Sequence, residues 1–308
     1  MQITTVFWNI HKRPEAFESL TRLTSKHDAQ IVLVAEMPKP DEPGLNGNPT
    51  GVLLDALNRS APSRSFTKFR LISAPQGQGQ NTDTDAVQVF SRLSTAIRWK
   101  RIATHKRYTI WKITIPGHRT FHLAAAHFTS LQNDQGDGQR ECAVALRTDL
   151  EQAERKLHPS KDTYKNLDPL SIVIGDLNAN PFDPGIVSVY GLNATGLRST
   201  AQEGFREHQG REYPYLYNPM WPFLNTDSPD SFYKRIDAPV RFDWFLLDQV
   251  LVRPGCMELF GKKQDPDLRL LTHDGIEDLI KGPNKTLKEG ISDHLPLLFR
   301  FDLPSLKE

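Results

Sequence analysis

The 308-residue sequence contains only two cysteines, Cys142 and Cys256, which lie far apart and have no histidine ligands nearby. A disulfide framework and a zinc site, which need closely spaced cysteines, are therefore not expected. The sequence also lacks any apolar run near the roughly 20 residues that a membrane span needs. Its first residues have neither the charged nor the apolar region of a secretory signal. We therefore expect a cytoplasmic protein without a membrane span.

An excess of charge of one sign is also missing. The 38 Lys and Arg residues are balanced by 37 Asp and Glu residues, which leaves a formal net charge of +1. This balance excludes a generally basic nucleic-acid coat protein, so a basic surface has to be sought locally. The hydrophobic fraction of 38% and the charged fraction of 24% are ordinary for a folded globular chain and argue against disorder.

Hydrophobic patterns predict alternating strands and helices. Residues 2–10 and 30–36 are apolar, and both are typical of buried strands. Between them, Pro14 precedes a helical pattern that includes Phe17, Leu20 and Leu23, so a right-handed crossover would make the two strands parallel. A second helix is predicted around Val52–Asn58. Strand-like runs follow at 66–73, 86–91, 96–103, 107–115 and 119–128, and their short connections predict antiparallel pairing.

The second half of the sequence continues the mixture. Apolar residues at helical spacing predict a long amphipathic helix over 137–158. Strands are predicted before Gly175 and Asp176, and at 241–247, 249–252 and 296–302. Residues 199–235 show no clear periodicity and are interpreted as an insertion loop. Because no long linker interrupts the chain, we expect a single domain over residues 1–308 with mixed sheets.

Polar side chains stand at four strand ends: Asn9, Glu36, Asp176 with Asn178, and Asp293 with His294. Strand ends are where α/β sheets usually bind ligands, and hard oxygen donors suit Mg²⁺ or Mn²⁺. Each motif taken alone also fits a simpler role, because Gly-Asp-x-Asn usually forms a turn and Ser-Asp-His can begin a helix or lie in a solvated loop. Their occurrence together in one chain favours a metal-dependent site.

The order of these motifs resembles the endonuclease/exonuclease/phosphatase superfamily, the deoxyribonuclease-I-like group. The resemblance extends over nearly the whole chain and is carried by FWN at 7–9, AEM at 35–37, HFTS at 127–130, GDLNANP at 175–181, RFDWFLL at 241–247 and SDHLPL at 292–297. It implies a four-layer α/β/β/α sandwich of two mixed β-sheets flanked by helices. The residue patterns alone leave a single-sheet α/β fold open.

The resemblance also implies a role for each residue. Glu36 and Asp293 would bind the metal ion, and Asn9 would help to hold the metal or the phosphate. Asp176 would orient or deprotonate the attacking water, and Asn178 would donate to the phosphate. Because the two residues are two apart on what we expect to be an extended segment, their side chains should lie on the same side. His294, paired with Asp243, would contact the phosphate or transfer a proton. His127 matches a histidine of the nuclease, sphingomyelinase and deadenylase branches, although a core histidine bonded to the backbone is the alternative. The remaining histidines, including His11, are interpreted as surface or local hydrogen-bonding residues.

A basic stretch suggests a substrate surface. Residues 92–112 contain seven Lys or Arg residues and no acidic residue, interleaved with Trp99, Tyr108 and Trp111. Such a surface can follow a phosphate backbone and stack bases, so nucleic acid is the expected partner and the candidate contacts are Arg98, Trp99, Lys100 and Arg101. The same alternation also describes a half-solvated antiparallel strand pair. The aromatic segment 199–235 would either close over the substrate or pack on the sheet edge.

Three functions are consistent with these observations. The first is a Mg²⁺- or Mn²⁺-dependent nuclease that hydrolyses phosphodiester bonds in DNA or RNA. The second is a phosphatase or phosphodiesterase for small-molecule or lipid phosphates, and the third is a catalytically silent binding module. The complete set of candidate catalytic residues favours an enzyme. The sequence leaves open the choice between DNA and RNA, the number of metal ions and the oligomeric state.

Overall fold

The structure is a computed structural model that describes residues 1–60, 67–73, 86–130, 136–157, 163–164, 167–225, 229–234, 243–259, 268–282 and 286–303. The chain divides into two compact units, one of residues 1–97, 229–245 and 264–303, and one of residues 98–228, 246–263 and 304–308. Each unit is built on one large mixed sheet accompanied by helices, which confirms the predicted α/β class with two mixed sheets. Among the described residues, no helix combines the length and the apolar character needed to cross a membrane.

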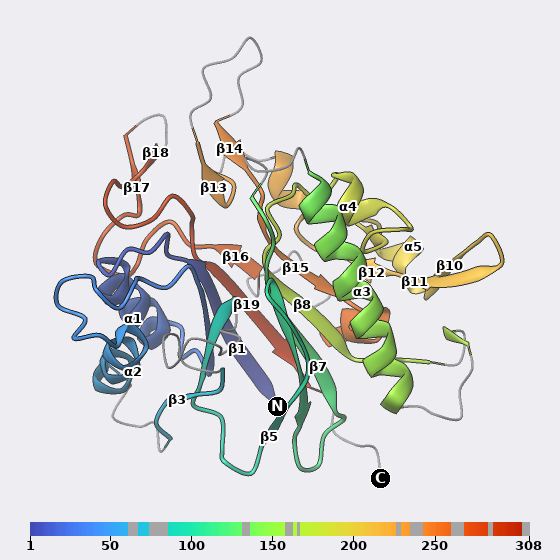
Figure 1. The fold of residues 1–308 in the computed structure, drawn as a ribbon, viewed down its shortest axis with the longest axis horizontal. Coiled ribbons are helices and arrows are strands. Elements are labelled where there is room, and N and C mark those ends of the chain that lie inside the picture. Colours follow the sequence, from blue (N-terminus) through green and yellow to red (C-terminus); the bar gives the residue numbers. More distant parts are fainter. Residues whose placement is uncertain are drawn as a thin grey trace. The chain divides into compact units, whose positions relative to one another are not determined.

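The first unit contains a six-stranded sheet (Figure 1). Its strand order is β16 (Leu268–Leu270), β19 (Leu297–Asp302), β1 (Gln2–Asn9), β2 (Ile31–Ala35), β4 (Val87–Ser91) and β3 (Arg70–Leu71). β1 and β2 are parallel, as the crossover rule predicted, and the other neighbours are antiparallel. The strand predicted for 66–73 is shorter than expected, and residue 66 lies outside the described residues.

Two helices cover one face of this sheet. α1 (Ala16–Lys26) connects β1 to β2, and α2 (Pro49–Ser60) lies beside it in Figure 1. α1 buries Phe17, Leu20 and Leu23, the residues whose spacing predicted it, against a core that includes Val6 and Trp8 of β1. Because alternate residues of a strand point to opposite faces, Val6 and Trp8 define the face that the helices cover.

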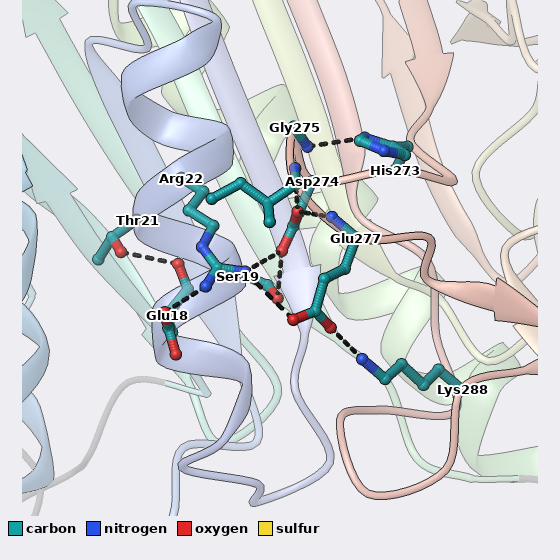
Figure 2. A network of polar contacts seen from close by, with 10 residues as sticks. Glu18, Ser19, Thr21, Arg22, His273, Asp274, Gly275, Glu277 and Lys288 are labelled. Carbon is teal, nitrogen blue, oxygen red and sulfur yellow. Dashed lines mark hydrogen bonds and ion pairs between the residues drawn. The ribbon is translucent and has the colours of Figure 1, made fainter.

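A turn fastens the C-terminal part of the unit to α1, as Figure 2 shows. The Asp274 carboxylate accepts hydrogen bonds from the hydroxyl of Ser19 (2.7 Å) and the guanidinium of Arg22 (3.1 Å). The same carboxylate accepts the backbone N–H groups of Ile276 and Glu277, both at 2.8 Å.

Two short ribbons complete the unit: β13 (Phe232–Tyr233) pairs with β14 (Trp244–Phe245), and β17 (Ile280–Lys281) pairs with β18 (Thr286–Leu287).

The second unit contains a seven-stranded sheet. Its strand order is β5 (Arg98–His105), β6 (Tyr108–Thr114), β7 (Phe121–His127), β8 (Ser171–Asp176), β15 (Asp248–Val252), β12 (Leu216–Tyr217) and β9 (Ala194–Thr195). The predicted antiparallel pairing is confirmed for β5, β6 and β7, whereas β4 and β5 belong to different sheets and do not pair. β7 and β8 are parallel, and β8 and β15 are antiparallel.

The long helix α3 (Asp137–Leu157) covers one face of this sheet, close to the predicted range of 137–158. Ala143, Leu146 and Leu150 of α3 pack on Ile110 of β6 and Ala124 of β7. Shorter helices follow at α4 (Pro184–Val187), α5 (Arg198–Gln202) and η4 (Pro254–Leu259).

The segment 199–235, predicted as an irregular insertion, has regular structure in its described part. It contains a hairpin of β10 (Phe205–His208) and β11 (Arg211–Pro214), followed by β12 and η3 (Trp221–Asn225). Residues 226–228 and 235 lie outside the described residues. The hairpin was missed because its strands are short and polar, without an apolar alternation. The strand predicted for 241–247 is present only at Trp244–Phe245, and residues 241–242 are also outside the described part.

Candidate functional site

In the first unit, the ends of two parallel strands position Asn9 and Glu36. Asn9 is the last residue of β1, and Glu36 directly follows β2, so both lie at the carboxyl edge of the sheet. The Asn9 side-chain amide donates a hydrogen bond to Glu36 Oε1 at 3.3 Å. Glu36 adopts a left-handed backbone conformation with φ of 49°, which is uncommon for a non-glycine residue and is often found at functional sites. The structure thus brings together two of the predicted metal-site residues.

His11 lies beside two of the predicted ligands, although the sequence interpretation assigned it no role. Its Nδ1 atom is 3.3 Å from Asp293 Oδ1 and 3.9 Å from Glu36 Oε2. Lys12 Nζ is 3.6 Å from the same Glu36 oxygen. Glu36 and Asp293 therefore face a common position next to His11. The signal in the sequence was the position of His11, two residues beyond a strand-terminal asparagine.

A small ribbon holds His294 and Asp243. Phe232 of β13 lies opposite both His294 and Phe245, so that β13 separates the two segments. The Lys234 backbone N–H donates to the Asp243 carbonyl at 2.9 Å, so the pairing of β13 and β14 continues to Asp243. The His294 ring packs 4.7 Å from the Phe232 ring, and its carbonyl accepts a hydrogen bond from the Trp8 indole at 2.9 Å. The direct pairing of the Asp243 carboxylate with the His294 imidazole stays a prediction.

In the second unit, Asp176 stands at the end of β8 between two other polar residues. The parallel register of β7 and β8 places His127 beside Asp176, and His127 Nε2 is 3.8 Å from Asp176 Oδ2. The antiparallel register of β8 and β15 places Asp248 on its other side, with carboxylate oxygens of the two aspartates within 4.8 Å of each other. Both aspartates are buried. We call this row of His127, Asp176 and Asp248 the Asp176 row.

Asp248 was missed by the sequence interpretation. It lies inside the apolar run WFLLDQVLV, and a buried carboxylate in such a run is unusual unless it is paired or binds a cation. A carboxylate within an apolar strand sequence could therefore have identified Asp248 as a candidate site residue. The position opposite Asp176 could not have been predicted, because it depends on the pairing of two strands that are far apart in the sequence.

The segment after Asp176 differs from the expected geometry. The prediction had Asp176 and Asn178 on an extended segment with their side chains on one side, but the strand ends at Asp176, and Asn178 is left-handed with φ of 48°. The Asn178 backbone N–H donates to Asp176 Oδ1 at 2.9 Å, and its side-chain amide donates to the Phe128 carbonyl at 3.0 Å. This tight turn fixes both side chains. The Asn178 side-chain amide has two N–H groups, and the bond to Phe128 uses one of them.

Gly175 allows β8 to approach β7 closely. A Cβ atom at this position would lie 1.9 Å from the Ala126 carbonyl oxygen. Only glycine fits in this gap, and the close approach places Asp176 next to His127 in the adjoining ladder position. The glycine of the GDLNANP motif therefore serves the geometry of the Asp176 row.

The four basic and aromatic candidates at residues 98–101 do not share one face. They form the start of β5, so Arg98 and Lys100 point to one side and Trp99 and Arg101 to the other. The register through β6 and β7 places Trp99 and Arg101 on the face that also carries His127. The predicted single basic face is thus divided, and only Trp99 and Arg101 share a face with the Asp176 row.

One acidic group of the first unit has a raised pKa. Burial raises the pKa of Asp230 to about 6. Asp230 precedes Ser231, whose carbonyl accepts the backbone N–H of Leu295 at 2.7 Å, so it lies next to the His294 segment in the fold. Carboxyl groups with raised pKa values are common in sites of proton transfer. The sequence interpretation did not single out Asp230, and nothing in its local pattern marks it.

These groups offer the donors of a hard-cation site and a candidate general base. Carboxylate and amide oxygens at Glu36, Asp293 and Asn9 match the ligands that hard divalent cations prefer. A buried aspartate beside a histidine, as in the Asp176 row, can orient a water molecule and accept its proton.

No protein-family model matches the sequence, and no curated protein sequence is similar to it. Solved structures are similar over 98% of the chain. They include an endonuclease/exonuclease/phosphatase family protein from Bacteroides thetaiotaomicron, with 12% identity, 95% of that chain covered and a TM-score of 0.52. The mannosyl-6-phosphatase of the same organism has 11% identity, 99% coverage and a TM-score of 0.51. The catalytic domain of human Nocturnin, solved with a bound sulfate anion, has 14% identity, 95% coverage and a TM-score of 0.50.

At these identities the similarity concerns the fold. The matches extend over nearly the whole of this chain and of each compared chain, and they agree with the motifs that run from residue 7 to residue 297. The chain therefore has the fold of the endonuclease/exonuclease/phosphatase superfamily, as its motifs predicted.

Proposed function

We propose that the protein is a divalent-metal-dependent phosphoesterase, most specifically a nuclease that hydrolyses phosphodiester bonds in DNA or RNA. The observation that carries the proposal is the Asp176 row, in which a buried aspartate at a strand end has a histidine on one side and a second aspartate on the other. This row occurs in a chain with the fold of an endonuclease/exonuclease/phosphatase family protein and of a mannosyl-6-phosphatase.

In this proposal, Glu36 and Asp293 bind Mg²⁺ or Mn²⁺, and Asn9 orients Glu36. The donor set fits such an ion, because it offers oxygen ligands and no sulfur. The Asn9–Glu36 hydrogen bond and the left-handed backbone at Glu36 fix the direction of that carboxylate before an ion binds. When bound, the ion would neutralise charge on the phosphoryl oxygens.

The protein's own groups would handle the water and the protons. Asp176 would orient the attacking water and accept its proton, and His127 would support the negative charge of Asp176 from 3.8 Å. The second N–H of the Asn178 amide would donate to a phosphate oxygen. His294 would contact the phosphate or protonate the leaving oxygen, with Asp243 fixing its tautomer.

For the substrate, Trp99 and Arg101 favour nucleic acid. They share the sheet face of His127, where an indole can stack on a base and a guanidinium can pair with backbone phosphate. We expect these two residues, rather than Arg98 and Lys100, to contribute to binding.

A second candidate function is hydrolysis of a small phosphate ester. A cavity of about 440 Å³ in the first unit is lined by His11, Arg13, Tyr233, Ser292 and Asp293, among others. This volume is in the range of small-molecule sites. Arg13 could pair with a phosphate, and Tyr233 could pack on an organic group.

The test is a substrate panel of supercoiled plasmid, single-stranded DNA, single-stranded RNA, an abasic duplex and small phosphomonoesters and diesters, each with Mg²⁺ and Mn²⁺. Cleavage of a polymer that EDTA abolishes is the expected result. Release of phosphate from monoesters alone would replace the nuclease assignment with the small-molecule one. If no substrate is cleaved with either metal, the protein is a binding module instead.

Variants test the assigned residues. Because general acid–base groups contribute about 10²- to 10⁴-fold, Asp176→Asn and His294→Ala should each lower turnover by roughly that factor. Asp137→Asn removes one carboxylate from the exposed first turn of α3 and is the matched control, expected to keep the wild-type rate. Near-wild-type turnover in either variant would refute the catalytic role assigned to that residue. A far-ultraviolet circular dichroism spectrum confirms that each variant is folded.

A further inference from the structure

Four neighbouring strands of the second unit carry a row of residues that the proposed reaction does not use. Lys100 of β5 lies opposite Lys112 of β6, and Lys112 lies opposite His122 of β7. His122 lies beside Ser171 of β8, with 3.4 Å between His122 Nδ1 and Ser171 Oγ. Residues directly opposite each other in an antiparallel pair have Cβ atoms about 5 Å apart. The register therefore places two lysines and a histidine in adjacent positions.

This basic row is separate from the Asp176 row. His122 is near the start of β7 and His127 is at its end, five residues away, or roughly 16 Å along a strand. Because the two histidines differ by an odd number of positions, they also lie on opposite faces of the sheet. His122 shares the face of Ala124, which α3 covers.

The last turns of α3 complete a pocket over the basic row. Its lining includes Lys100, Lys112 and His122 from the sheet and Gln152, Lys156 and Leu157 from the helix. His122 is 1% exposed, so this part of the pocket is withdrawn from solvent. Three lysines thus surround one cavity, with a buried imidazole at its base.

The positive charge of the pocket is not balanced by the acidic residues that the structure describes. Within this part of the chain, no carboxylate forms an ion pair with Lys100, Lys112 or Lys156. Asp149 also lines the pocket, where its carboxylate accepts the hydroxyl of Tyr108 at 2.8 Å, and its single negative charge offsets only one of the three lysines. Like charges directly opposite in a sheet are destabilising, so the row would be stabilised by a bound anion.

We propose that this pocket binds a compact phosphate-bearing anion, inorganic phosphate or pyrophosphate in size. The cavity volume is about 180 Å³, enough for roughly six water molecules and smaller than the sites that hold whole nucleotides. Lysine ammonium groups are compact point charges that suit phosphate oxygens, and the His122 imidazole adds an N–H donor. The inference does not depend on the proposed reaction.

The test is titration calorimetry with pyrophosphate and with phosphate, in EDTA so that no divalent ion is present. We expect saturable binding to the wild-type protein and a melting temperature that rises with anion concentration. The double variant Lys100→Gln with Lys112→Gln should weaken binding at least tenfold, since each charged hydrogen bond contributes about that factor. Lys106→Gln is the matched control, because it removes one charge from the turn of the same hairpin, and its affinity should stay within about twofold.

Without the anion, the double variant should melt at or above the wild-type temperature, because it removes repulsion. Lys156→Gln, at an exposed position of α3, tests anion binding independently if the Lys100→Gln, Lys112→Gln double variant does not fold. We expect this variant to bind pyrophosphate more weakly than the wild type. No binding up to about 10 mM, or unchanged affinity in both pocket variants, would overturn the proposal. So would binding that is lost in Asp176→Asn but kept in the pocket variants, or binding of an oligonucleotide without binding of pyrophosphate.

Discussion

Asp274 offers a direct test of what holds the first unit together. Its carboxylate receives four hydrogen bonds, from Ser19, Arg22 and two backbone N–H groups of its own turn (Figure 2). Burial alone would raise the pKa of Asp274, but these donors outweigh burial and lower it to about 2 from 3.8. That difference corresponds to roughly 2 kcal/mol of folding stability at neutral pH. We predict that Asp274→Asn lowers the free energy of unfolding by about this amount.

The pH dependence gives the prediction its sign. Because the folded-state pKa is lower than the unfolded one, the unfolded chain binds more protons between the two values, and stability rises with pH. The contribution is fully present above about pH 4 and is lost as the pH falls through about 2. Asparagine keeps an acceptor for the turn but carries no charge, so the variant should lack this pH-dependent increment.

The measurement is urea unfolding followed by tryptophan fluorescence from pH 7 down to the lowest pH at which the wild type stays folded. The wild type and Asp274→Asn should differ by about 2 kcal/mol at pH 7 and converge in acid. Asp278→Asn, an exposed aspartate at the far side of the same turn, should change stability by less than about 0.5 kcal/mol. A constant difference at all pH values, or equal stability at pH 7, would refute the electrostatic reasoning.

Three further predictions concern the second unit. Asp248→Asn should lower turnover at least about tenfold in steady-state assays without changing the melting temperature by more than a few degrees, and an unchanged rate would exclude it from the site. Gly175→Ala should destabilise the protein by about 3 kcal/mol or more in urea melts, because its Cβ would meet the Ala126 carbonyl, and wild-type stability would show that β8 can shift. Glu154 and Arg253 form a fully buried ion pair at 2.8 Å. Glu154→Gln should therefore lower the free energy of unfolding by about 3–5 kcal/mol in urea melts. A loss below about 1 kcal/mol would mean that other acceptors satisfy the Arg253 guanidinium.

Much of the fold could be predicted because its central strands are continuous apolar runs. β2 and β8 are buried along their whole length, and each run ends at a polar residue that marks the strand end. The strand ends in turn located Asn9, Glu36 and Asp176, since each is the polar residue at which an apolar run stops. Where strands are short and polar, as at β10 and β11, the apolar pattern is absent and the prediction did not find them.

The partners of the site residues could not be predicted, since they depend on strand order. Asp248 reaches Asp176 only because β15 adds to β8, and neither local spacing nor propensity encodes that pairing. The same is true of Lys100, Lys112 and His122, which are ordinary residues in three separate strands until the register aligns them. At Asn178 the observed turn differs from the expected extended segment for another reason. Asparagine tolerates the left-handed conformation, which ends the strand at Asp176.

The pairing of β1 with β19 has a consequence for the time course of folding. Residues 2–7 of the first strand bond with residues 297–302, so nearly the whole chain separates the two partners. At a synthesis rate of about 5–20 residues per second, the second partner leaves the ribosome roughly 15 to 60 s after the first. During this interval one edge of β1 lacks its neighbour, and such an edge is a template for association with other chains. We therefore expect the nascent chain to depend on chaperones more than the finished protein does, and refolding from denaturant to be slow, as for other chains with distant contacts.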